Sequence, residues 1–348
     1  MKRFVFLFLS LILTTFPELS RAQQISFSQT LILMGSRFEI TAVANADSTA
    51  KHSVDIAIAE ISRIERLISE WDSASQTSEI NRQAGIRPVK VSWELFSLIR
   101  RSNKVSALTG GAFDITFASA DRIWKFDGSM KNIPTEEEIQ RSVARIGYEK
   151  IEINPEDTTI FLPERGMKIG FGGIGKGYAA NMARTAMQNA GVTGGLVNAG
   201  GDLTCWGQSP TPGGWRVGIA NPRSRSQLAA WMEINEMAVV TSGNYERFVI
   251  LDGKRYAHII HPKTGWPATG LQSVTIICPD AELADALATA VFVMGQSEGM
   301  ALVNQLKGVE CMMINDQDEI IKSDKLNMHF YQNPATSATE TPELIIGQ

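Results

Sequence analysis

The sequence has few of the residues that build metal clusters or disulfide frameworks. Its 348 residues include four histidines and three cysteines, which are Cys205, Cys278 and Cys311. Because the cysteines lie far apart and form no C-x-x-C pair, a structural zinc site is not expected. One disulfide could form in an oxidising compartment, but we expect buried single thiols instead.

The sequence also lacks a block of basic residues. It has 33 Lys and Arg residues against 37 Asp and Glu residues, which gives a formal net charge of −4. Domains that bind nucleic acid usually carry a basic face or stripe. Nucleic acid is therefore not an expected partner.

An apolar run occurs at the amino terminus, and we expect no membrane span further along the chain. Lys2 and Arg3 precede an uncharged stretch from Phe4 to Phe16, and Ser20-Arg21-Ala22 has the small-x-small form of a cleavage site. This pattern predicts a secretory signal peptide over residues 1–22. An uncleaved anchor is the minor alternative, because the run is short for a bilayer span. The mature protein is expected to be exported and periplasmic.

The rest of the chain mixes helical and strand patterns without a visible repeat. Short alternating apolar runs with glycine-rich turns, from residue 194 to 278, are typical of antiparallel sheet. The order of elements is too irregular for a doubly wound parallel sheet, so we predict an α+β fold. One domain is expected over residues 23–331, and a disordered tail rich in Thr, Pro and Ser over 332–348. Helix N-caps are expected at Asp47, Ser92 and Thr135.

A glycine-rich segment, KIGFGGIGKGYAAN at 168–181, matches two nucleotide-binding patterns. It spells G-x-G-x-x-G from Gly170 to Gly175 and G-x-x-x-x-G-K-G from Gly170 to Gly177. A dinucleotide fold needs an acidic residue about twenty positions later, and none occurs between Lys176 and Asp202. A Walker loop needs a final Ser or Thr for magnesium, and glycine stands there. Neither pattern is satisfied, and the glycines alone would also suit a tight turn into a helix.

Seven short motifs follow one another along most of the chain. They are MGS (34–36), GAFDIT (111–116), GGIGKGYAAN (172–181), VNAGGDL (197–203), VVTSGNYERF (239–248), AHIIHPKTG (257–265) and ADALATAVFVMG (284–295). Together they resemble the ApbE family of FAD:protein FMN transferases, over roughly Leu31 to Gly295. The resemblance implies a T-fold-like α+β architecture, with mixed or antiparallel sheets and packed helices, and it implies export.

The resemblance implies a specific reaction on FAD. The pyrophosphate is cleaved, FMN is joined through its phosphate to a Thr or Ser hydroxyl of an acceptor protein, and AMP leaves. Mg²⁺ would neutralise the charge that repels the nucleophile. The implied acceptors belong to exported electron-transport complexes. The enzyme is therefore expected to contact the membrane only through its acceptor. Two alternatives stay open: a magnesium-dependent FAD pyrophosphatase and a non-enzymatic periplasmic FAD-binding protein.

A magnesium site is predicted on the ADALATA segment. Asp285 and Thr289 are four residues apart, so on a helix their oxygens share one face. The resemblance places the metal there, with a further oxygen from the backbone of Gly173, while Ala288 could offer only its carbonyl. The glycine loop is then expected to hold phosphate through its backbone, the amides of the following helix, and the charge of Lys176.

The flavin contacts are predicted from the resemblance alone. Trp71 is expected to stack on a ring, and ordinary core packing is the alternative interpretation. Asp114 is expected to orient polar groups. Gly170 departs from the family form D-L-G-G-I-A-K-G, where an Asp is usual, which puts that contact in doubt. The implied contact residues are Met34, Trp71, Ala112, Phe113, Asp114, Gly170, Lys176 and Ile259.

A base for the acceptor hydroxyl is expected at His258. It lies in HIIHP, which the family writes HIIDP, so His261 is a second departure. His261 could tune His258, bind a metal or face solvent. Together with the metal carboxylate Asp285, His258 completes the predicted catalytic residues.

The tail contains a string that resembles the acceptor pattern D-x-x-[ST]-[GS]-A-T. Residues 333–339 spell NPATSAT, with Asn333 in place of the Asp and Thr339 at the modified position. Flavinylation of Thr339 by the enzyme itself is one hypothesis. A chance match in a Thr- and Ser-rich tail is the simpler interpretation.

Overall fold

The computed structural model describes residues 24–330, except 223 and 246, together with 345–347. The predicted signal peptide and most of the tail, including Thr339, therefore lie outside the described residues.

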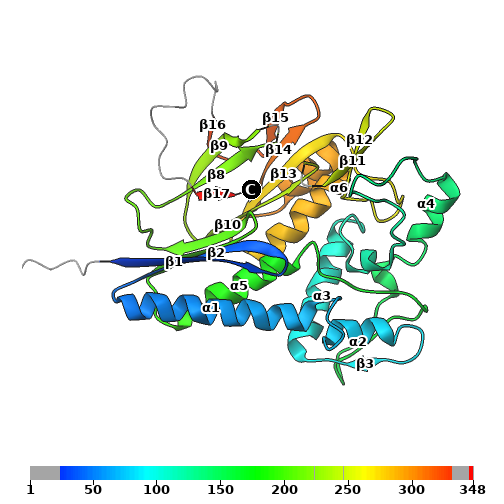
Figure 1. Ribbon diagram of the computed structural model, residues 1–348, viewed down its shortest axis with the longest axis horizontal. Coiled ribbons are helices and arrows are strands. Elements are labelled where there is room, and N and C mark those ends of the chain that lie inside the picture. The colour runs from blue at the N-terminus through cyan, green and yellow to red at the C-terminus, as the bar shows by residue number, and fades with distance from the viewer. Residues whose placement is uncertain (1–23, 223, 246, 331–344, 348) are drawn as a thin grey trace, which may run out of the picture.

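The described chain is built around an eight-stranded sheet (Figure 1). Its neighbouring strands all pair antiparallel. Successive residues of a strand face opposite sides, so Val239 packs into one core and Val240 into another. In sheet order the strands are β1 (Ile25–Leu33), β2 (Ser36–Ala44), β6 (Gly194–Ala199), β7 (Asp202–Gly207), β10 (Met237–Gly243), β13 (Leu271–Cys278), β14 (Glu310–Asn315) and β15 (Ile320–Lys322).

Helices α1 (Asp47–Ile68), α5 (Gly175–Asn189) and α6 (Ala281–Gln305) cover one face of this sheet. α1 buries Val54, Ile61, Ile64 and Ile68, because residues at this spacing share one side of a helix. Its start differs from our expectation. The N-cap residue is Ala46, while Asp47 is the first helical residue and pairs with Lys51 at 2.7 Å.

A second, four-stranded sheet covers the other face, and Trp215 is the largest side chain buried between the two. Three residues of the tail that we expected to be disordered lie in this sheet, where β17 pairs parallel with β8. The strands in order are β16 (His329–Phe330), β9 (Ser224–Ile234), β8 (Trp215–Asn221) and β17 (Ile345–Gly347).

The remaining elements gather at the end of the molecule where α4 lies (Figure 1). Ser92 caps α3 through the amide of Leu95, and Thr135 and Glu138 form the capping box of α4, which confirms both predicted caps. These elements are α2 (Gln76–Arg82), α3 (Trp93–Leu108), α4 (Glu136–Val143), the 3₁₀ turns η1 (Ile115–Ser119) and η2 (Tyr148–Lys150), the small sheet of β3 (Val89–Lys90), β5 (Thr159–Phe161) and β4 (Glu152–Asn154), and the hairpin of β11 (Phe248–Leu251) and β12 (Lys254–Ala257).

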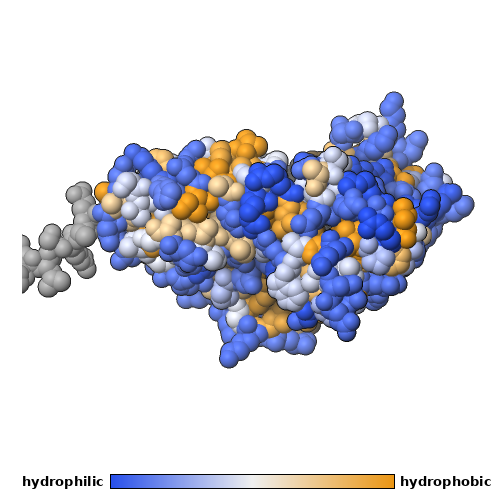
Figure 2. All heavy atoms as spheres, turned by 90° about the horizontal axis from the view of Figure 1, so that it is seen from below, coloured by the Kyte–Doolittle hydropathy of each residue, from blue (hydrophilic) through white to orange (hydrophobic). Residues whose placement is uncertain are grey.

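The predicted α+β class is confirmed. Cys205, Cys278 and Cys311 are buried free thiols, as expected. One expectation needs correction, because α6 is long and apolar enough, by length and composition, to cross a membrane. In the structure it packs against both the sheet and its neighbour α5, as the central helix of a folded core does. On the face seen in Figure 2, apolar residues lie in several separate patches among hydrophilic ones.

Candidate active site

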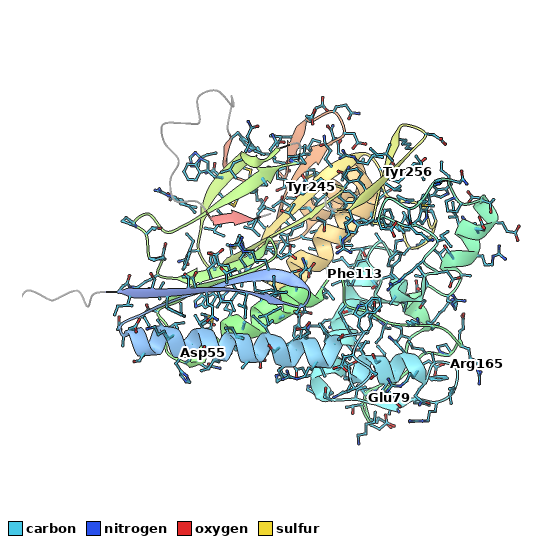
Figure 3. All side chains as sticks on the ribbon, viewed as in Figure 1. Asp55, Glu79, Phe113, Arg165, Tyr245 and Tyr256 are labelled. Carbon is cyan, nitrogen blue, oxygen red and sulfur yellow. The ribbon has the colours of Figure 1, made fainter. Side chains whose placement is uncertain are left out.

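A cavity of about 330 Å³ opens where five segments of the chain meet. They are the turn after α1, the segment that leads into η1, the glycine loop before α5, the chain after β12, and α6. Phe113 lies at this junction, between α6 and the helices at the α4 end (Figure 3). Eight of the predicted residues line the cavity: Ala112, Phe113, Asp114, Gly170, Gly173, His258, Ile259 and Thr289.

Outside the residues that line the cavity, α5 and α6 approach one another closely at Gly177. A Cβ atom there would lie 2.1 Å from the carbonyl oxygen of Ala281, so only glycine fits. The amide of Gly177 donates a hydrogen bond to Asp285 Oδ2 at 3.0 Å. This differs from our expectation, since an N-terminal amide of α5 is taken by a carboxylate of the protein.

Two buried carboxylates and one ammonium meet at this contact. Lys176 Nζ lies 2.6 Å from Oδ2 of Asp202, at the start of β7, so the ammonium and this carboxylate form an ion pair. Burial, and then the neighbouring Asp202 carboxylate, raise the pKa of Asp285 to about 7, while Lys176 and the Gly177 amide oppose that rise. Burial likewise raises the pKa of Asp202. A buried cluster with this excess of negative charge favours the binding of a cation.

The oxygens around Asp285 suit a hard cation. Thr289 lies one helical turn further along α6, and its Oγ1 is 3.5 Å from Ser242 Oγ. A Cβ atom on Gly173 would lie 3.1 Å from the same Thr289 oxygen, so loop and helix meet here. Within the described residues no group of three or more His, Cys, Asp or Glu side chains could hold a metal. One carboxylate with hydroxyl and carbonyl oxygens, and remaining positions for water, is a set that Mg²⁺ accepts. We call Gly173, Lys176, Asp202, Asp285 and Thr289 the inner end of the site.

His258 faces the same cavity from the chain that follows β12. Its Nδ1 lies 3.2 Å from the carbonyl oxygen of Arg247. A carbonyl can only accept, so this hydrogen bond requires a proton on Nδ1, and Nε2 then carries the basic lone pair. The geometry gives His258 the tautomer that a general base at Nε2 needs.

The sequence model of the ApbE family matches residues 34–313. The chain belongs to the ApbE family. Two curated relatives named FAD:protein FMN transferase support this: that of Klebsiella pneumoniae (strain 342) is 29% identical over 306 residues, which is 87% of this chain and 94% of the relative. That of Treponema pallidum (strain Nichols) is 28% identical, over 84% of this chain and 86% of the relative.

Solved structures agree with the family and confirm the fold. The crystal structure of the ApbE protein from Thermotoga maritima is similar with a TM-score of 0.78 at 31% identity, over 86% of this chain and 97% of that one. The flavin transferase ApbE from Vibrio cholerae is similar with a TM-score of 0.77 at 26% identity, over 87% of this chain and 98% of that one.

Two of the residues that the family resemblance suggested serve the local structure. Asp114 accepts hydrogen bonds from the Thr116 amide at 2.8 Å, from the Thr116 hydroxyl at 2.6 Å and from the Tyr148 amide at 2.9 Å, so it holds these two segments of the protein together. Met34 forms the β1–β2 turn, with φ of 49°, and its Cε would lie 3.8 Å from a Cβ on Gly175. Ala288 is fully buried on α6.

His261 and Trp71 lie further out. Nδ1 of His261 accepts from the Lys263 amide at 3.1 Å, and burial lowers the pKa of His261. Trp71 is 72% exposed, which excludes the core-packing interpretation. The Arg122 guanidinium lies 4.5 Å from the centre of its ring. Trp71 and Arg122 line a second cavity of about 530 Å³.

Sequence reasoning missed Glu70, which lines both cavities. We call Glu70, Trp71 and Arg122 the outer wall of the site. The sequence also did not reveal Asp202 as the partner of Lys176, or Ser242 as the neighbour of Thr289. The signal for Glu70 was its position next to Trp71. Asp202 and Ser242 lie in the family motifs, which suggested a place near the pocket for both but not these partners.

Proposed function

We propose that this chain is a magnesium-dependent FAD:protein FMN transferase that acts after export. It joins FMN through its phosphate to a Thr or Ser hydroxyl of an acceptor protein and releases AMP. One observation carries the proposal. Segments distant in the sequence, each matching the family, bring Phe113, His258 and Thr289 to one cavity, with the buried Asp285 one turn away on α6.

The reaction can be assigned to the residues of the chain. An acceptor hydroxyl oxygen attacks the FMN phosphorus, and the bond from that phosphorus to the bridging oxygen breaks. AMP leaves with that oxygen, and the hydroxyl proton moves to Nε2 of His258. The backbone of the glycine loop lies along the cavity. Apart from Gly172 and its two chain neighbours, no described residue has an atom within 4 Å of the place of a Cβ on Gly172, so phosphate can approach it closely.

Asp285, Thr289 and the Gly173 carbonyl are the groups that would hold magnesium. When bound, the ion supplies positive charge against the pyrophosphate, so that an oxygen nucleophile can approach. The excess of buried negative charge at the inner end supports this assignment, since a cation relieves the repulsion between Asp202 and Asp285.

The place of action and the acceptor are supported by the sequence. The basic start, apolar run and small-x-small site of residues 1–22 are those of a signal peptide, so we place the enzyme in the periplasm. The family suggests an acceptor in an exported electron-transport complex.

One experiment separates this function from its alternatives. The purified protein is mixed with FAD, MgCl₂ and a candidate acceptor domain, then denatured and analysed by intact mass. We expect the acceptor to gain the mass of FMN, AMP to appear, and EDTA to stop both. Free FMN with AMP and an unmodified acceptor would show a pyrophosphatase. Unchanged FAD, with an acceptor that a known relative does modify, would show a binding protein.

A further inference from the structure

The carboxylate of Glu70 occupies the space above Gly170. A Cβ atom on Gly170 would lie 2.7 Å from Glu70 Oε2 and 3.0 Å from the Cβ of Ala118. The amide of Gly170 donates to the carbonyl of Ile115 at 2.9 Å, which fixes the loop against η1. A side chain at position 170 and the carboxylate of Glu70 therefore compete for one volume.

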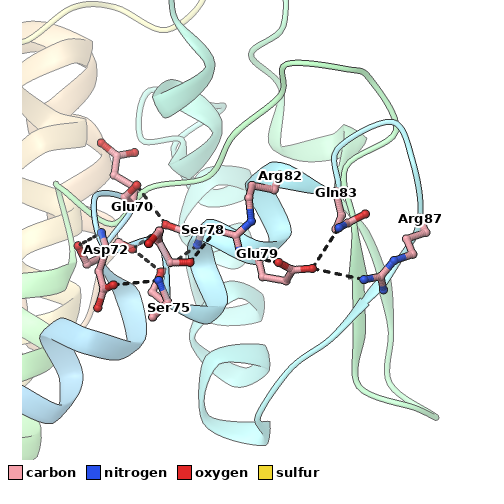
Figure 4. Close-up of polar contacts among 11 residues, drawn as sticks. Glu70, Asp72, Ser75, Ser78, Glu79, Arg82, Gln83 and Arg87 are labelled. Atoms are coloured by element: carbon pink, nitrogen blue, oxygen red, sulfur yellow. Dashed lines mark hydrogen bonds and ion pairs between the residues drawn. The ribbon is translucent and has the colours of Figure 1, made fainter.

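That volume lies at the boundary between the two cavities. Glu70 and Ala118 line both of them, while Trp71 and Arg122 line only the outer one and Gly170 only the inner one. Figure 4 shows the Glu70 side chain pointing away from the hydrogen-bonded turn that joins α1 to α2. That turn uses the main chain of Glu70, whose carbonyl accepts from Ser78 Oγ at 3.2 Å. The carboxylate itself is left directed to the cavities.

The surroundings keep this carboxylate available for a ligand. Its side chain is 26% exposed, and burial raises the pKa of Glu70 while Arg122 and Lys168 oppose that rise. The Arg122 guanidinium is 3.9 Å from Oε1, beyond hydrogen-bond distance, because it lies over the Trp71 ring. A half-buried carboxylate in this position gains free energy from any ligand group that donates a hydrogen bond to it.

We propose that Glu70 is the FAD-binding carboxylate of the outer wall, where it takes the place that a side chain at position 170 would fill. It accepts a hydrogen bond from a hydroxyl or ring N–H of FAD. The inference rests on the proposed function, because it takes FAD as the ligand. It also accounts for the glycine at position 170, where the family form has an aspartate: here the carboxylate comes from the end of α1, a hundred positions earlier.

A double-mutant cycle tests whether the carboxylate of Glu70 replaces an aspartate at position 170. FAD dissociation constants are measured by flavin fluorescence for the wild type, Glu70→Ala, Gly170→Asp and Glu70→Ala/Gly170→Asp, with Glu70→Gln as an isosteric variant. Glu60→Ala is the control, since Glu60 is a partly buried glutamate on α1 that pairs with Arg63. Circular dichroism melting confirms that each variant is folded.

We expect Glu70→Ala to weaken FAD binding about 10- to 100-fold, the size of a lost hydrogen bond to a charged group. Gly170→Asp alone should also weaken binding, because two carboxylates then share one volume. The double variant should return to within about threefold of the wild type, and Glu70→Gln should fall between. Wild-type affinity in Glu70→Ala, or additive losses in the double variant, would overturn the inference and leave the transferase assignment intact. A wild type that binds no FAD would overturn both.

Two further titrations locate the donor on FAD. If Glu70→Ala weakens ADP binding and spares FMN binding, the donor belongs to the adenosine half. The opposite pattern assigns it to the flavin half. Equal affinities of wild type and variant for FAD, ADP and FMN would remove Glu70 from the binding site.

Discussion

At the inner end of the site, α5 and α6 are so close that Gly177 has no room for a methyl group, and Asp285 is 4% exposed. At the outer wall, Trp71 is 72% exposed and Glu70 is held by a turn at the end of α1. The inner end positions its charges through close packing before any ligand arrives. The outer wall leaves its polar groups in contact with solvent, where a ligand can replace water.

This difference separates two tasks. Groups that stabilise charge in a reaction work best when they are fixed and buried, since reorganisation then costs little. Groups that choose a ligand can be more exposed, because each contributes only a modest binding energy. Changes at the inner end should therefore have large effects on rate or folding, and changes at the outer wall smaller effects on affinity.

The largest effect is expected from Asp285→Ala, which removes the buried carboxylate that we assign to magnesium. Transfer to the acceptor should be abolished while the protein stays folded, because the alanine also relieves the repulsion with Asp202. Covalent flavin on a denatured acceptor is the measurement, and Thr289→Val is the milder companion, since water can replace a neutral ligand. Near wild-type transfer by Asp285→Ala at ordinary magnesium would contradict the assignment.

His258→Asn comes next. Loss of a general base costs about two to four orders of magnitude in rate, and we expect a loss of that size at saturating FAD and acceptor. FAD affinity should be nearly unchanged, because asparagine keeps a polar group at the cavity. A weaker affinity with an unchanged rate at saturation would instead make His258 a binding residue.

Gly177→Ala tests the packing of the inner end. A Cβ atom at 2.1 Å from the Ala281 carbonyl must push two backbones apart, so we expect a loss of about 3 kcal/mol or more in the free energy of unfolding. Gly172→Ala is the matched control and should be near neutral in urea unfolding, because among the described residues only its two chain neighbours come within 4 Å of the new Cβ. Equal stability of the two variants would show that α5 and α6 can separate freely.

Lys176→Met removes the ammonium next to Asp202. The buried carboxylate then lacks its counter-charge, and we expect a loss of about 2 to 3 kcal/mol, near the low end for a broken buried pair because Lys176 is 30% exposed. Lys176→Met/Asp202→Asn should regain most of this loss, since no uncompensated charge remains. If Lys176→Met unfolds at the same urea concentration as the wild type, the pair does not stabilise the inner end.

The sequence predicted features that local rules determine. Ser92 and Thr135 cap helices because an N-cap depends on residues within one turn. Asp285 and Thr289 were placed on one helical face by their spacing alone. The family motifs added residues that are distant in the sequence, and eight of the residues predicted in this way line one cavity. Helix and strand periodicity alone could not have grouped them.

What the sequence did not show depends on contacts between distant segments. The charge of Lys176 was assigned to phosphate from its place in the loop, and its ion pair with Asp202 on β7 could not be predicted from that segment. Gly177 stands where a Walker loop needs Ser or Thr. The structure explains the glycine, because the backbone of α6 leaves no room there for a side chain. Glu70 gave no signal, because its relation to Gly170 spans a hundred residues. Such pairings follow from tertiary packing, which no local spacing encodes.

The smallest effect is expected at the outer wall, from Trp71→Leu. Leucine keeps apolar area but loses the aromatic face on which Arg122 lies and on which a ring of FAD could stack. An exposed cation–π or stacking contact contributes about 0.5 to 1 kcal/mol, so FAD affinity should fall only about two- to fivefold, with an unchanged transfer rate at saturation. Trp93→Leu is the control, an exposed tryptophan on α3 that stacks on Phe96. A fall of more than about thirtyfold would place Trp71 in a closed part of the bound site, whereas no fall would remove it from the FAD contacts.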